Sequence, residues 1–203
     1  MLKKLFIIRH GETEYNRLNI VQGSGVDTDL NETGRMQAAQ FYASFSTHPF
    51  DALYTSAMRR SQQSVEGFIQ SGLPHTILPE LNEISWGDFE GRPQSHEQKA
   101  VYHDMITRWS SGDVHAKIPN GESPYELAQR QQSAIHHIFN RTHEKEVLIC
   151  MHGRAMKSFL CLLLNKPLSH MEQFQHTNLC LYTLGHDGNT NVLLTANDTT
   201  HLK

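Results

Sequence analysis

Apolar residues follow two alternating patterns along the chain. One is a short apolar run, such as Phe6 to Ile8, which is typical of a strand buried in a sheet. The other is a longer segment with apolar residues every three or four positions, which is typical of a helix with one buried face. These patterns predict strands at residues 2–8, 51–55, 76–78, 147–151, 179–184 and 191–195, and helices at residues 32–46, 57–71, 95–110, 124–141 and 155–164.

Local signals support two of the predicted helix ends. Ser123, Pro124 and Glu126 have the types and spacing of an N-cap serine, a first-turn proline and the glutamate of a capping box. Gly72 followed by Pro74 is a stop signal for the helix predicted at 57–71.

The order of these elements predicts an α/β fold. Strands that alternate with helices form a mostly parallel central sheet with helices on both faces. The last two strands flank Gly185 to Gly188 and should form a C-terminal antiparallel hairpin. Residues 86–121 interrupt the alternation, and we expect them to form a helical insertion over the active-site rim. No linker is evident, so residues 1–203 are expected to be a single domain.

Composition excludes several classes of protein. The formal net charge of −3 provides no general attraction for nucleic acid, so an anion site requires a local group of cations. The apolar run at 5–8 is shorter than the core of a signal peptide, and no segment has the length of a membrane span. Cys150, Cys161 and Cys180 lie in apolar runs without metal-site spacing, which favours buried reduced thiols. We therefore expect a cytoplasmic protein that binds neither nucleic acid nor membrane.

Two histidines follow predicted strands directly. Arg9 and His10 come after the first strand, and His152 comes after the strand at 147–151. The carboxyl ends of parallel strands share one rim of a sheet, so these side chains are expected to meet there. Gly11 and Gly153, one after each histidine, allow close approach of the backbone.

Together with further motifs along the chain, these residues make the sequence resemble the histidine phosphatase superfamily, which is also called the phosphoglycerate mutase-like family. The family signature R-H-G-[EQ]-[ST] matches residues 9–13, and an ordered series of further blocks covers nearly the whole chain. These blocks are Asn16, Gln22-Gly23, residues 29–34, Ser56 to Arg60, Glu83 within residues 81–87, Gly121-Glu122-Ser123 and His152-Gly153.

The resemblance implies a role for each matching residue. His10 would be the nucleophile that accepts the phosphoryl group, and Glu83 would give a proton to the leaving oxygen. The implied phosphate-binding residues are Arg9, Arg60, His152 and Asn16. Gln22 and Gly23 would either contact the substrate or turn their loop, and Gly153 would lie against the phosphate. Guanidinium forks match phosphoryl oxygens and stay charged, which makes a metal ion dispensable.

Residue types alone leave some assignments open. Arg59 competes with Arg60 for the inward position. Glu12, Glu80 and Glu122 compete with Glu83, and family context selects Glu83. Trp86, Phe89, Tyr102 and Trp109 are candidates for a substrate wall, although aromatic residues are more often part of a core.

The same pocket could serve a phosphatase or a mutase. A mutase excludes water and needs extra cations around a doubly charged phospho-acid. The cations between Glu83 and His152 are scattered, which favours a phosphatase that acts on a small phosphorylated metabolite without a cofactor. The alternatives are a mutase that depends on 2,3-bisphosphoglycerate, a non-catalytic module that binds a phosphorylated ligand, and a metallohydrolase, although no H-E-x-x-H spacing is present. An exposed strand edge would be compatible with a homodimer.

Overall fold

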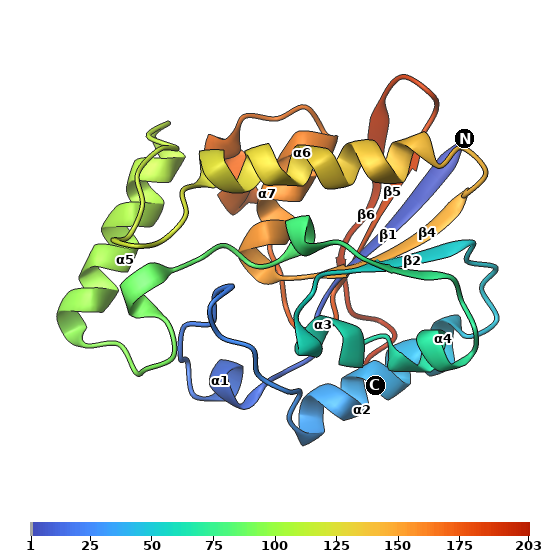
Figure 1. Cartoon of the computed structure of the whole chain (residues 1–203), viewed down its shortest axis with the longest axis horizontal. Coiled ribbons are helices and arrows are strands. Elements are labelled where there is room, and N and C mark those ends of the chain that lie inside the picture. The colour runs from blue at the N-terminus through green and yellow to red at the C-terminus, as the bar shows by residue number, and fades with distance from the viewer. Residues whose placement is uncertain (1) are drawn as a thin grey trace.

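The computed structural model describes residues 2–203, which contain a six-stranded sheet (Figure 1). Its strands are β1 (Lys3–Arg9), β2 (Ala52–Thr55), β3 (His75–Ile77), β4 (Glu146–Met151), β5 (Leu181–His186) and β6 (Asn191–Asp198). The strand order is β3-β2-β4-β1-β5-β6. The first four strands pair in parallel, whereas β5 is antiparallel to both β1 and β6. The expected α/β class and the C-terminal antiparallel hairpin are confirmed.

Helices cover both faces of this sheet. They are α1 (Glu14–Arg17), α2 (Glu32–Phe45), α3 (Arg59–Gln63), α4 (Glu66–Gln70), α5 (His96–Ser110), α6 (Pro124–Asn140) and α7 (Gly153–Leu163), with short 3₁₀ turns η1 (Pro79–Leu81), η2 (Gly87–Phe89) and η3 (Leu168–Gln173). Helices α6 and α7 lie on one face, and α2 and α4 lie on the other (Figure 1). None of the helices between residues 2 and 203 is long and apolar enough to span a membrane.

The central strands are apolar throughout because both of their faces are buried. In β1, Leu5 and Ile7 belong to the core beneath α6 and α7. Phe6 and Ile8 point the other way and pack in the core with α2 and α4. Successive side chains of a strand point to opposite faces, so a continuous apolar run fills two cores.

The helix predicted at 57–71 is the main error in the predicted elements. It is broken into α3 and α4 at Ser64 and Val65. The Ser64 hydroxyl donates to the Arg60 carbonyl at 2.6 Å and accepts from the Gly11 backbone N–H at 2.8 Å. A serine hydroxyl that bonds the backbone in this way competes with continuation of a helix. The capping box predicted at Ser123 is present.

The insertion at 86–121 is held together by its own aromatic residues. Trp86 stacks near Trp109 with ring centroids 5.5 Å apart, and the Trp109 indole donates to the Ala116 carbonyl at 2.7 Å. Helix α5 lies at the end of the molecule away from β6 (Figure 1). Its residue Tyr102 and the preceding Gln94 line the same cavity as His10. The insertion therefore forms part of the active-site rim, as expected.

Candidate active site

His10 and His152 come together at the carboxyl ends of two neighbouring parallel strands. His10 directly follows β1 and His152 directly follows β4, and these two strands are paired in register. Their ring centroids are 5.1 Å apart. The side chains are almost entirely buried, with 3% of His10 and 0% of His152 exposed. The convergence expected from the strand ends is present.

The hydrogen bonding of His10 determines which ring nitrogen can attack. Its Nδ1 lies 2.7 Å from the carbonyl oxygen of Gly11. A carbonyl only accepts hydrogen bonds, so Nδ1 carries the proton in the neutral ring. The lone pair of the neutral imidazole is then on Nε2.

His152 is held from both sides. Arg60 donates from Nε to His152 Nδ1 at 3.2 Å, so the proton of the neutral ring is on Nε2. This Nε2–H donates to the Ser56 hydroxyl at 2.7 Å. Ser56 follows β2, the third strand to end at this rim, and contacts Ser61 Oγ at 2.7 Å.

Arg60, rather than Arg59, turns inward. Arg60 is 0% exposed, and it donates to the carbonyls of Val26 at 2.7 Å and Gly23 at 3.3 Å. Arg59 is exposed and pairs with Asp27 and Asp29. The loop that contains Gly23 thus orients the buried guanidinium.

Arg9 is oriented by a histidine that sequence reasoning missed. Arg9 donates from Nη1 to His176 Nδ1 at 3.1 Å. The His176 ring packs against Gly153, where an added Cβ would lie 2.7 Å from its Cε1. Gly11 is similar, because a Cβ there would lie 2.8 Å from the Gly34 carbonyl oxygen. Both glycines were expected to allow close approach of the backbone, and the groups that lie close to them are the His176 ring and the Gly34 backbone.

Glu83 is anchored at the N-terminus of α7. Its Oε1 accepts from the backbone N–H groups of Ile84 at 2.9 Å and Ala155 at 2.7 Å, and its Oε2 accepts from that of Arg154 at 3.0 Å. A helix N-terminus attracts negative charge and supplies backbone donors, so it fixes the carboxylate in position.

The three competing glutamates do not line the cavity beside His10. Glu12 accepts from Asn31 Nδ2 at 2.7 Å, Glu122 pairs with Arg130, and Glu80 lies in the turn before Glu83.

A cavity of about 460 Å³ opens beside His10. The predicted site residues that line it are Arg9, His10, Asn16, Gln22 and Glu83. The others lie outside the lining, and they are Arg60, His152, Gly23 and Gly153. Five of the predicted residues therefore line the cavity, and Arg60 and His152 are buried next to this lining.

A second residue that sequence reasoning missed, Asn178, lies on the β5 side of the cavity. Asn178 donates to the His10 carbonyl at 3.0 Å and to Asn16 Oδ1 at 3.2 Å, and it lines the cavity. His176 and Asn178 precede β5. Because β5 runs antiparallel to β1, β5 begins at the rim where β1 ends. The position of His176 and Asn178 just before a predicted antiparallel strand is therefore the signal that could have identified them.

The buried histidines of the site favour their neutral forms. Burial, followed by the positive charges of Arg60 and Arg9, lowers the pKa of His10 well below its ordinary value. Burial and Arg60 lower the pKa of His152 in the same direction. Burial and Arg9 lower the pKa of His176 to about 2. A neutral His10 keeps the lone pair that a nucleophile requires.

These shifts predict a loss of stability in mild acid. Below about pH 6.5 the unfolded chain binds protons at His10, His152 and His176 that the folded chain does not, so the free energy of unfolding decreases as pH decreases. We expect these three groups to lower the free energy of unfolding by about 4 kcal/mol between about pH 7.5 and about pH 5.5, because each contributes about 1.4 kcal/mol over this interval. Urea unfolding at both pH values measures it, and His176→Gln should remove about one third. An unchanged unfolding midpoint would contradict buried neutral histidines.

Comparison with known proteins agrees with this geometry. The family model described as "Histidine phosphatase superfamily (branch 1)" matches residues 5–199. The adenosylcobalamin/alpha-ribazole phosphatase of Escherichia coli is 28% identical over 180 residues, which is 87% of each chain. Phosphoserine phosphatase 1 of Hydrogenobacter thermophilus is 26% identical and covers 98% of this chain and 94% of its own. The crystal structure of the alpha-ribazole phosphatase from Shigella flexneri superposes with a TM-score of 0.84 at 26% identity and covers 96% of each chain. This chain therefore belongs to the histidine phosphatase superfamily.

Proposed function

We propose that the chain hydrolyses phosphomonoesters of small uncharged alcohols through a phosphohistidine at His10, without a metal ion. The observation that carries the proposal is the oriented His10 imidazole, whose Nδ1 is held by the Gly11 carbonyl while its ring borders the cavity. In the first step Nε2 attacks phosphorus and the ester P–O bond breaks. In the second step water takes the phosphoryl group from His10, which releases phosphate and restores the neutral ring.

Charge and proton transfer are divided among the neighbouring side chains. The guanidinium groups of Arg9 and Arg60 offset the negative charge of the transferring group and remain charged at any working pH. Glu83 donates a proton to the leaving oxygen in the first step and accepts one from water in the second. His152, held between Arg60 and Ser56, packs beside the His10 ring and accepts from Arg60, so it helps to hold this guanidinium next to the nucleophile.

The lining of the cavity favours a phosphatase over a mutase. Among the described residues, Arg9 is the one cation in the lining, and the rest of the wall consists mainly of amide and aromatic side chains, including Asn19, Gln94 and Tyr102. Amides and aromatic faces suit a hydroxyl-bearing or ring-containing alcohol. A second anionic group would have to be buried without a cationic partner, which is unfavourable.

The cations that a mutase would need are engaged outside this cavity. Arg108 pairs with Asp113 at 2.6 Å, and Lys117 pairs with Glu126 at 2.7 Å. Arg130 is paired with Glu122. The similarity to enzymes named as phosphatases of alpha-ribazole and phosphoserine supports hydrolysis of small metabolites. Apart from Arg9 and Glu83, the wall that residues 2–203 form carries no charged side chain, which favours the phosphate ester of an uncharged alcohol over the charged amino acid ester.

The test is a phosphate-release assay in excess EDTA on a panel that pairs neutral and acidic alcohols. Ribose 5-phosphate and a nucleoside 5′-monophosphate should be hydrolysed with higher kcat/KM than phosphoserine and 3-phosphoglycerate. Activity that disappears in EDTA would contradict the metal-free mechanism. Conversion of 3-phosphoglycerate into 2-phosphoglycerate, dependent on a bisphosphate primer, would identify a mutase instead.

A further inference from the structure

The segment from Asn82 to Trp86, which carries Glu83, separates two cavities. Glu83 and Trp86 line the active-site cavity. Asn82 and Ser85 line a second cavity, also of about 460 Å³. The segment is neither helix nor strand. Its backbone polar groups therefore depend on partners outside regular secondary structure.

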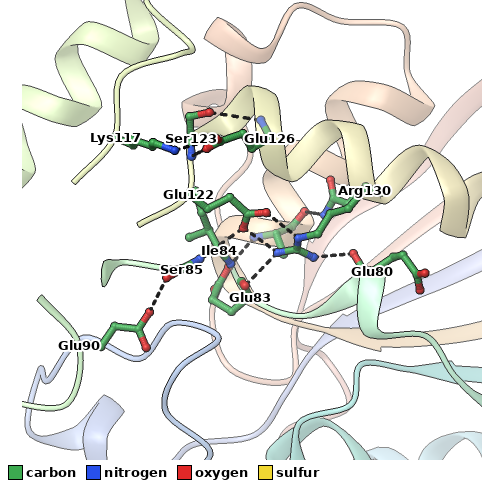
Figure 2. Close-up of polar contacts among 12 residues, drawn as sticks. Glu80, Glu83, Ile84, Ser85, Glu90, Lys117, Glu122, Ser123, Glu126 and Arg130 are labelled. Atoms are coloured by element: carbon green, nitrogen blue, oxygen red, sulfur yellow. Dashed lines mark hydrogen bonds and ion pairs between the residues drawn. The ribbon is translucent and has the colours of Figure 1, made fainter. Parts of the chain in front are cut away.

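Arg130 provides one of those partners from the side of the second cavity, and it also binds the turn η1 that precedes the segment. It projects from α6, and its guanidinium lies against the carbonyls of Glu83 and Glu80 (Figure 2). Nη2 donates to the carbonyl oxygen of Glu83 at 2.9 Å, and Nη1 donates to that of Glu80 at 2.6 Å. Helix α6 is itself fixed by buried apolar residues such as Leu127. The backbone of the proposed proton donor is thus tied to a packed helix.

Glu122 holds the guanidinium in this orientation. Arg130 Nε lies 2.7 Å from Glu122 Oε1, and Nη2 lies 2.9 Å from Oε2, a two-point contact that fixes the plane of the fork (Figure 2). The backbone N–H of Glu122 also donates to the Ser85 carbonyl at 2.8 Å. Both ion-pair partners are largely covered, with 24% of Arg130 and 18% of Glu122 exposed.

We propose that Arg130, oriented by Glu122, is a positioning residue for the Glu83 carboxylate. The inference rests on the proposed function, because it requires Glu83 to transfer a proton. Glu83 is held at two points: its carboxylate by the N-terminus of α7 and its carbonyl by Arg130. Loss of the second point would let the backbone shift, and a displacement of about 1 Å at a reacting group can lower a rate about 100-fold.

A second ion pair on α6 provides a matched control. Lys117 Nζ contacts Glu126 Oε1 at 2.7 Å, and its carboxylate partner is on the same helix as Arg130 (Figure 2). The side chains of Lys117 and Glu126 are 44% and 47% exposed, and the pair bonds to the cap of α6 rather than to the Glu83 segment. Lys117→Met removes a cation that pairs with a residue of α6, but it removes no contact to Glu83.

The experiment compares two leaving groups. Arg130→Met, Arg130→Lys and Lys117→Met are each measured in the parent protein and in the Glu83→Gln background. The substrates are an aryl phosphate, whose leaving oxygen needs little protonation, and an alkyl phosphate, whose leaving oxygen needs it. Arg130→Met should lower kcat/KM for the alkyl ester by about 10- to 100-fold. The aryl ester should be affected far less, and Lys117→Met should change neither.

Coupling to Glu83 is the decisive readout. In the Glu83→Gln background Arg130→Met should cause no further loss, because the group that it positions can no longer donate a proton. Arg130→Lys, which keeps the charge but loses the fork, should fall between the parent and Arg130→Met. Equal losses on both esters, or the same loss in the Glu83→Gln background, would overturn the inference.

Failures of folding and of the proposed function are distinguishable from these outcomes. If Arg130→Met does not fold, Glu122→Gln takes its place, because it weakens the ion pair that orients the Arg130 guanidinium. This variant should also lower kcat/KM for the alkyl ester more than for the aryl ester, and equal losses on both esters would overturn the inference. If the parent protein hydrolyses neither ester, the proposed function is wrong. If the parent hydrolyses both and the Arg130 variants show no leaving-group dependence, the positioning role alone is wrong.

Discussion

We expect His10→Ala to lower kcat/KM for every phosphomonoester substrate by about 10⁴-fold or more, which is the scale seen when a covalent nucleophile is removed. The reason is that the first step has no second group to replace the Nε2 lone pair. His152, the neighbouring imidazole, carries the proton on Nε2 and has its Nδ1 bonded to Arg60. Steady-state hydrolysis of an aryl phosphate measures the loss.

The fold should persist in this variant, because β1 and its pairing with β4 do not depend on the imidazole. Thermal unfolding monitored by circular dichroism checks this. His48→Ala is a suitable control, since His48 is a partly buried histidine that bonds Glu146 at 3.0 Å on a different part of the molecule. Activity of His10→Ala within about tenfold of the parent would exclude His10 as the nucleophile.

We expect Glu83→Gln to lower kcat/KM for alkyl phosphates by about 10²- to 10⁴-fold, the usual contribution of general acid catalysis. Aryl phosphates should lose much less, because their leaving oxygen departs without a proton. The substitution keeps the shape of the side chain and one oxygen to accept from Ala155 and Ile84. Rates for a series of esters of increasing leaving-group basicity measure the difference.

Glu80→Gln is the control for Glu83→Gln, because Glu80 is nearby in sequence but outside the active-site cavity. It should leave both classes of ester unaffected. A uniform loss across the series in Glu83→Gln would show that Glu83 supports the structure of the site without transferring a proton.

The convergence of the two histidines could be predicted because it follows from topology. His10 and His152 each end a buried strand, and neighbouring parallel strands bring their ends to one rim. The inward position of Arg60 was also expected, but only from family spacing. Its selection over Arg59 depends on carbonyls of the 23–26 loop, which local sequence does not place beside it.

The missed features all depend on partners distant in sequence. The break between α3 and α4 involves Ser64 bonding the N–H of Gly11, which lies 53 positions earlier. His176 and Asn178 reach the site because β5 runs antiparallel to β1 and begins at the rim. Periodicity predicts which residues of a segment are buried, but it contains no information about which distant group a polar side chain will meet.

The most direct measurement is the identification of the phosphorylated residue during turnover. The parent protein is mixed with an aryl phosphate and quenched in alkali, which preserves a phosphorylated histidine, and its peptides are mapped by mass. We expect a burst of one phenol per active site and a phosphoryl group on the His10 imidazole. Turnover with the phosphoryl group on any other residue, or with a direct transfer to water that leaves no labelled peptide under burst conditions, would contradict the account.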